Sequence, residues 1–127
     1  SVQVDPFAPD TVYAATLAGL YKTTNGAASW VRIGESLQDQ MIVAMVLDRT
    51  RAGVIYLAGR DGIHRSEDGG LNWTPLNDGF TTTNIRSLAQ SATDAKVFYA
   101  GTNGSGLYKS LDGGAHWEPM PSVFPKE

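Results

Sequence analysis

The chain has 127 residues, of which 42% are hydrophobic and 18% are charged, and its formal net charge is −3. This length corresponds to one domain, and the slightly acidic charge excludes the basic surface that binds nucleic acid. The chain contains no cysteine, so disulfides and thiolate metal sites are excluded. Its longest apolar run, Met41 to Leu47, is too short to span a membrane.

Strand patterns follow one another in groups of four along the chain. The predicted strands are residues 1–4, 11–15, 19–22 and 30–34, then 42–47, 54–58, 62–65 and 73–77, and finally 85–90, 96–101, 106–109 and 117–120. Turn signals such as Asp61-Gly62 and Asn103-Gly104 separate the strands, and no segment has a helical period. The run 41–47 is apolar at every position, which predicts a strand buried on both faces.

A turn that ends in tryptophan occurs three times. The three copies, here called the tryptophan turns, are 23–30 (TTNGAASW), 66–73 (SEDGGLNW) and 110–117 (SLDGGAHW), and their tryptophans lie 43 and 44 residues apart. A fixed period of this size predicts a repeat architecture of stacked units. Four short antiparallel strands in each period describe one blade of a β-propeller.

The repeats therefore predict an all-β fold, a β-propeller segment of three four-stranded antiparallel blades. The blades cover about residues 1–40, 41–83 and 84–127 of a single segment, 1–127. Propellers have roughly four to eight blades, so three blades leave two faces uncovered. Either the chain is a piece of a longer propeller, or copies associate head to tail into a closed ring. The sequence leaves both alternatives open.

Residues of the tryptophan turns have structural roles that follow from their chemistry. The aspartates can accept hydrogen bonds from backbone N–H groups of the turn, the glycines permit left-handed backbone, and the tryptophans can cover the turn. In the first copy, Asn25 replaces the aspartate and Ala27 the second glycine. Structural roles are expected for Thr23, Asn25, Trp30, Ser66, Asp68, Gly70, Trp73, Ser110, Asp112, Gly114 and Trp117.

The tryptophan turns resemble the Asp-box, or BNR repeat, with the pattern Ser/Thr-x-Asp-x-Gly-x-x-Trp. Sialidases, xyloglucan-cleaving glycoside hydrolases, sortilin-type receptors and photosystem II assembly factors carry this repeat in their propellers. The resemblance covers the whole chain and implies that the turns lie on the face away from the ligand site. The compartment stays unknown from the sequence, and the resemblance favours an extracytoplasmic or secreted bacterial protein.

Candidate ligand-binding residues lie in the loops expected at the opposite end of the blades. These loops differ between the three copies, so their residues are free of the structural demands of the repeat. Arg60 and Asp61 form the best polar pair, although Asp61 followed by glycine is also a common hairpin turn. The candidates are Asp39, Arg60, Asp61, Asp78, Arg86 and Asn103.

The residues favour a binding function over catalysis. A glycosidase needs two carboxylates about 5–10 Å apart. The acidic candidates on the channel face can supply such a pair, but nothing besides their location marks them. His64 and His116 have no carboxylate partner at a fixed spacing in the sequence, so catalytic residues stay unknown and neither a metal nor a cofactor is expected.

The sequence therefore predicts a non-enzymatic propeller scaffold that binds protein or carbohydrate. Its ring would be completed by oligomerisation or by the rest of a longer propeller. The alternative is a segment of a glycoside hydrolase propeller that acts on polysaccharide. The expected partners are further copies of the chain or further blades, together with a protein or glycan ligand, and they include no nucleic acid.

Overall fold

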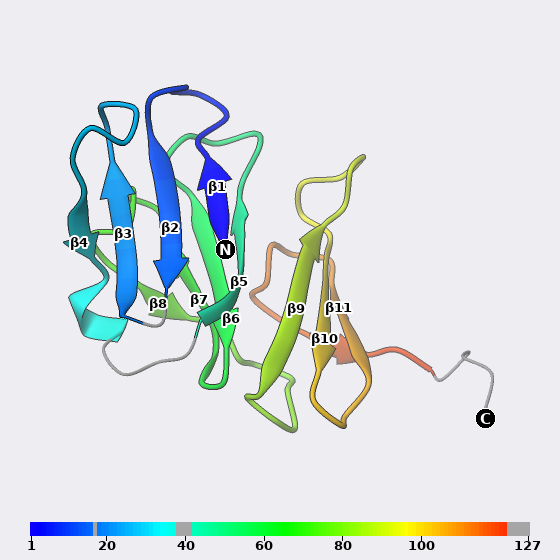
Figure 1. The fold of residues 1–127 in the computed structure, drawn as a ribbon. Helices are drawn as coiled ribbons and strands as arrows, with labels where there is room; N and C mark the ends of the chain where they lie inside the picture. Colours follow the sequence, from blue (N-terminus) through cyan, green and yellow to red (C-terminus); the bar gives the residue numbers. More distant parts are fainter. Residues whose placement is uncertain (17, 38–41, 122–127) are drawn as a thin grey trace, which may run out of the picture.

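Three separate four-stranded sheets make up the molecule. The computed structural model describes residues 1–16, 18–37 and 42–121. In each sheet the strands are antiparallel and follow one another in chain order, and the three sheets lie side by side as blades (Figure 1). This arrangement confirms the predicted all-β segment of three four-stranded blades.

The strand bounds follow the repeat. The first blade contains β1 (Val2–Val4), β2 (Val12–Thr16), β3 (Gly19–Thr23) and β4 (Val31–Ile33), and is followed by a short 3-10 helix, η1 (Glu35–Leu37). The second contains β5 (Ile42–Leu47), β6 (Ile55–Gly59), β7 (Gly62–Ser66) and β8 (Thr74–Pro75). The third contains β9 (Ile85–Gln90), β10 (Phe98–Thr102), β11 (Leu107–Ser110) and β12 (Glu118–Pro119). The first strand of each blade begins within one residue of its prediction, whereas β8 and β12 are shorter than predicted because only two residue pairs join each to its neighbour.

Burial is deepest in the second blade, which has a neighbour on both sides. All five residues of β6 are buried, as expected for a strand covered on both faces. The prediction that the run 41–47 is buried on both faces is wrong at Val43, which is 40% exposed. The reason is that the register between β5 and β6 shifts between Ile42 and Ala44, which leaves Val43 at a bulge without a partner in β6. Met41 lies outside the described residues.

The hydrophobic core lies between the blades. One cluster joins the first and second blades and includes Tyr13, Leu20, Met45 and Leu57, with Trp73 packed against it. The other joins the second and third blades and includes Tyr56, Ile63, Phe98, Tyr108 and Trp117. Each blade is therefore stabilised by its neighbours, as in other repeat folds.

The two ends of the blades carry different loops. At one end, here called the hairpin end, tight hairpins join β6 to β7 and β10 to β11 (Figure 1, bottom). At the other, the turn end, each tryptophan turn is bonded to the loop that follows the first strand of its blade. The backbone N–H groups of Gly26, Gly69 and Gly113 donate to the carbonyls of Asp10, Gly53 and Lys96 at 3.0, 2.9 and 2.8 Å. No helix in the described part of the chain is long and apolar enough to cross a membrane.

Candidate functional site

Hydrogen bonds to side chains of the tryptophan turns hold the backbone of each turn in place. In the second turn, Ser66 Oγ donates to Asp68 Oδ1 at 2.7 Å and accepts from Gly70 N at 2.9 Å. The same carboxylate accepts from the backbone of Asn72 at 2.9 Å and from its side chain at 2.7 Å. Hydrogen bonds from the backbone and side chain of Asn72, with that from Ser66, lower the pKa of Asp68 to about 2. The carboxylate therefore holds the turn in its ionised form.

The first and third turns repeat this network. Ser110 and Asp112 make the equivalent contacts, with Gly114 N donating to Ser110 Oγ at 2.8 Å and His116 N to Asp112 Oδ1 at 2.9 Å. In the first turn, Asn25 Oδ1 accepts from Thr23 Oγ1 at 2.8 Å and from Ser29 N at 3.0 Å. Asparagine thus supplies the acceptor geometry without the charge.

Each tryptophan turn that has a preceding blade is bonded to it. Tyr56 of β6 donates its hydroxyl to the carbonyl of Gly113 at 3.1 Å. Lys22 of β3 donates to the carbonyl of Gly69 at 3.3 Å. A side chain at Gly70 would approach Ile33 Cδ1 to 2.5 Å, and its φ is +97°. The second glycine of the motif is therefore required by both the backbone conformation and the neighbouring blade.

The tryptophans differ in burial according to whether a blade precedes them. Trp117 is 1% exposed, and its ring stacks on Phe80 with centroids 5.0 Å apart. Its Nε1 donates to the carbonyl of Leu76 at 3.2 Å. Trp73 is half-buried in the cluster between the first and second blades. Trp30, which has no preceding blade in this chain, is 41% exposed.

Four of the predicted ligand-face residues lie at the hairpin end. Arg60 and Asp61 form the exposed tip of the hairpin between β6 and β7. Asn103 begins the equivalent hairpin of the third blade. Its N–H donates to the carbonyl of Asn84 at 3.0 Å, and Asn84 is two residues before Arg86 in the chain. Asp39 lies outside the described residues.

Asp78 differs from its expected position. Its Oδ2 lies 2.8 Å from His116 Nδ1, and its carbonyl accepts from Trp117 N at 2.9 Å. These contacts hold it beside the third tryptophan turn rather than with Arg60 and Asp61. The sequence shows no carboxylate at a fixed spacing from His116, but the fold supplies one by joining residues 38 positions apart. The hydrogen bond from Asp78 raises the pKa of His116.

His64, the other histidine, has no such partner at bonding distance among the described residues. It lies half-buried on β7. Burial lowers the pKa of His64, and the charge of Asp61 opposes this effect only in part. The described residues contain no group of three or more histidine, cysteine, aspartate or glutamate side chains that could hold a metal ion.

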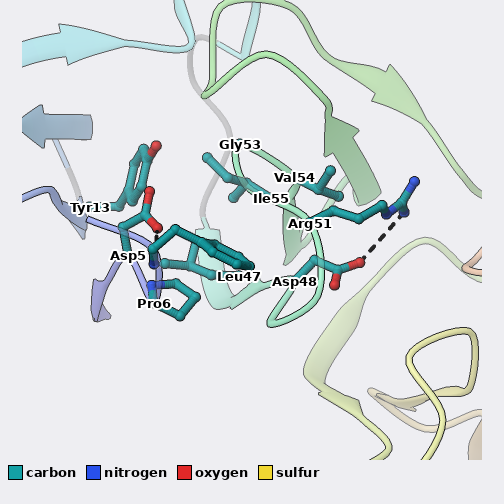
Figure 2. A pocket seen from close by; sticks show the side chains of 10 residues that line it. Asp5, Pro6, Tyr13, Leu47, Asp48, Arg51, Gly53, Val54 and Ile55 are labelled. Carbon is teal, nitrogen blue, oxygen red and sulfur yellow. Dashed lines mark hydrogen bonds and ion pairs between the residues drawn. The ribbon is translucent and has the colours of Figure 1, made fainter. Parts of the chain in front are cut away.

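A buried carboxylate that the sequence reasoning missed lies at the turn end. Asp48 is 2% exposed and accepts from the backbone and hydroxyl of Thr50 at 2.8 and 2.7 Å. Figure 2 shows it joined to Arg51 by an ion pair, which is 3.5 Å long. Burial raises the pKa of Asp48, but the bonds from Thr50 and Gln90 and the charge of Arg51 outweigh burial, so the pKa is lowered.

A signal for this carboxylate was present in the repeat. Asp5, Asp48 and Ser91 lie 43 residues apart. Each accepts, through its side chain, a hydrogen bond from the backbone N–H two residues later. Asp48 therefore follows from the same period as the tryptophan turns.

Comparison with known proteins identifies the fold. No protein-family model matches the chain, and no curated protein matches it. Among solved structures, an ancestral GH74 enzyme superposes with a TM-score of 0.82 at 23% identity, over 98% of this chain and 18% of that one. The GH74 enzyme of Niastella koreensis gives a TM-score of 0.71 at 20% identity, over 95% of this chain and 22% of that one.

A third solved structure, YCF48 bound to a D1 peptide, gives a TM-score of 0.62 at 21% identity, over 85% of this chain and 36% of that one. These likenesses show a β-propeller fold. The chain spans 18% to 36% of the length of these three structures. The three four-stranded blades are thus part of what a complete propeller contains.

Proposed function

We propose that this chain is a non-enzymatic binding scaffold whose two uncovered blade faces pack against each other between copies, so that the second face of one copy receives the tryptophan turn of the next. The completed ring would present its hairpin end to a protein or glycan ligand. The observation that carries the proposal is the exposure of Trp30 at the position where Trp73 and Trp117 pack against a preceding blade.

The first uncovered face consists of Val2, Val4 and Trp30. These side chains are 67%, 55% and 41% exposed. The strand registers place Val2 at the position of Met45, which is 4% exposed between the first and second blades. Burying three such side chains against another blade is favourable by roughly 1.5–3 kcal/mol for each fully buried one.

The second uncovered face consists of Tyr99, Leu107 and Met120 of the third blade. Tyr99 and Leu107 are half-buried, whereas their equivalents Tyr56 and Ile63 are 1% and 0% exposed against the third blade. Lys109 lies over the Tyr99 ring at 5.5 Å, as Lys22 lies over Tyr13 at 5.3 Å.

This second face therefore carries the groups that receive a tryptophan turn elsewhere in the chain. The ammonium group of Lys22 binds the turn of the next blade, and Lys109 occupies the equivalent position on β11. The favoured partner of the face is a blade that presents a tryptophan turn.

Ala27 can pack between the two faces only if the side chain opposite it leaves room for its methyl group. It occupies the position of Gly70, where a methyl group would meet Ile33 at 2.5 Å. Met120 is the residue that would face Ala27, because the backbone bonds of β7 and β11 make it the equivalent of Leu76. A methionine side chain is flexible enough to move aside, so the two faces remain compatible.

For the ligand, the hairpin end offers mixed charge rather than a pair of acids. Arg60, Asp61, Arg86 and Asn103 are all exposed. A glycosidase needs two carboxylates about 5–10 Å apart, and Asp78 is engaged with His116. Among the acidic candidates of the sequence analysis that the structure describes, Asp61 alone is exposed in this cluster, and binding is the function that these side chains support better.

The solution mass of the chain and two variants tests the proposal. Light scattering over a concentration series should give a dimer or larger ring for the wild type and a monomer for Trp30→Glu. Leu71→Glu is the matched control, because Leu71 is 75% exposed but belongs to neither uncovered face. A wild-type chain that is folded and monomeric at every concentration, or equal disruption by both variants, contradicts the proposal.

A further inference from the structure

A hollow of about 430 Å³ lies at the turn end between the second and third blades. Its walls come from the loop after β5, from β7, from the loop after β9 and from the third tryptophan turn. The lining side chains include Asp48, Thr50, Arg51, Arg65, Lys96 and Asp112. The hollow lies within one chain, so it exists whether or not the uncovered faces are occupied.

The two carboxylates of the hollow are already engaged. Asp48 accepts from Thr50 and from Arg51. Asp112 accepts from Ser110 Oγ at 2.8 Å and from the backbone of its own turn. Asp48 is thus paired with Arg51, and Asp112 serves its own turn, which leaves Arg65 and Lys96 as the cations of the hollow that neither carboxylate engages.

Arg65 is the cation with unused hydrogen-bonding capacity. Its Nη2 lies 3.1 Å from the exposed carboxylate of Glu67, and its side chain is 25% exposed. Its Nε is buried and has no hydrogen-bond partner in the part of the chain that the structure describes. A buried guanidinium N–H without a partner carries a desolvation cost, which a bound acceptor would relieve.

Comparison with the first blade explains why Arg65 is left in this state. Lys22 occupies the equivalent position on β3 and donates to the carbonyl of Gly69 in the next tryptophan turn. The equivalent carbonyl, that of Gly113, accepts instead from the hydroxyl of Tyr56. Arg65 therefore lacks the partner that its counterpart has, and its guanidinium is held by Glu67 at Nη2, with no partner at the buried Nε among the described residues.

We propose that the hollow binds a single oxyanion, a carboxylate or phosphate group, with Arg65 as the central donor. Arginine presents a planar fork of N–H groups that suits both anions. Lys96 lines the same space and adds positive charge, whereas Arg51 lies there paired with Asp48. This site lies at the turn end, at the opposite end of β7 from the hairpin tip, and is independent of the ligand surface proposed above.

Titration with inorganic phosphate and with acetate, at constant ionic strength in sodium chloride, tests the proposal and distinguishes the two anions. The Arg65 Nε–H signal in the NMR spectrum should shift saturably with at least one anion. Arg65→Gln should weaken binding at least roughly tenfold, since a hydrogen bond to a charged group contributes that much or more. Lys22→Gln, at the equivalent position of the first blade, should bind as the wild type does.

Lys96→Gln keeps the test independent of folding, because Lys96 is exposed and its loss leaves Arg65 in place. This variant should bind several-fold more weakly and melt as the wild type does. No saturable shift with either anion, or full binding by a folded Arg65→Gln or by Lys96→Gln, would overturn the proposal.

Discussion

Removal of the indole of Trp117 should be the most damaging single change among the three tryptophans. Trp117 is 1% exposed, stacks on Phe80 and donates to the carbonyl of Leu76. Truncation of a buried tryptophan to alanine costs about 3–5 kcal/mol. Loss of the Nε1 hydrogen bond contributes about 1 kcal/mol to such a change. We therefore expect Trp117→Ala to lower the free energy of unfolding by about 4–5 kcal/mol.

Trp30→Ala provides the matched comparison at the equivalent position of the first blade. Trp30 is 41% exposed and has no preceding blade to pack against. In the dissociated chain its removal should cost about 2–3 kcal/mol, in proportion to the apolar area that it buries. Trp73→Ala should fall between the two, because Trp73 is half-buried and its Nε1 donates within its own turn, to Gly70 at 3.0 Å.

Urea denaturation followed by far-ultraviolet circular dichroism measures these differences without using the tryptophan signal itself. The protein should be dilute enough to be monomeric, so that association does not add to the stability of the wild type. Equal losses for Trp117→Ala and Trp30→Ala would refute the claim that the indole stabilises the fold by packing against a preceding blade.

Three further predictions concern the turns themselves. Ala27 has a φ of 77°, so Ala27→Gly should relieve left-handed strain and raise stability by about 0.5–1 kcal/mol after the entropic cost of glycine; a lower melting temperature would contradict this reading. The folded pKa of Asp68 is lowered from 3.8 to about 2, so its stabilisation is present above that interval and lost as the pH falls through it, and Asp68→Ala should flatten the acid side of the stability curve. The pKa of His116 is raised from 6.5 by Asp78, so its stabilisation is full below pH 6.5 and disappears as the pH rises through the folded value. His116→Asn, which introduces the residue of the second turn, should remove that dependence in thermal melts recorded across neutral pH, and an unchanged pH profile would show that the pair contributes nothing.

Most of the fold could be predicted from the repeat pattern. Strands and hairpins are decided by local features, namely alternating apolar residues, turn dipeptides and a tryptophan at a fixed spacing, and these features occur three times in the sequence. The error in β5 occurred where the pairing between strands decides the outcome. Val43 is apolar like its neighbours in β5, yet it is exposed because it lies at a bulge where the pairing with β6 shifts.

The contacts of the candidate residues were harder to predict. Asp78 and His116 lie 38 residues apart, and only the packing of the second blade on the third joins them. The Nε of Arg65 has no partner among the described residues because the hydroxyl of Tyr56, on the neighbouring strand, donates to the carbonyl of Gly113 in the next turn. By contrast, Asp48 follows the 43-residue period through Asp5 and Ser91, so a closer comparison of the repeats identifies it from sequence.

The environment of Trp30 tests the central claim most directly. In a protein with Trp73→Phe and Trp117→Phe, Trp30 is the remaining tryptophan of the three, and its fluorescence reports on the first uncovered face alone. If this face packs against another blade, the emission should be blue-shifted and protected from acrylamide at high concentration, and both effects should disappear on dilution. A Trp30 that is equally accessible to the quencher at every concentration, in a folded chain, would contradict the account.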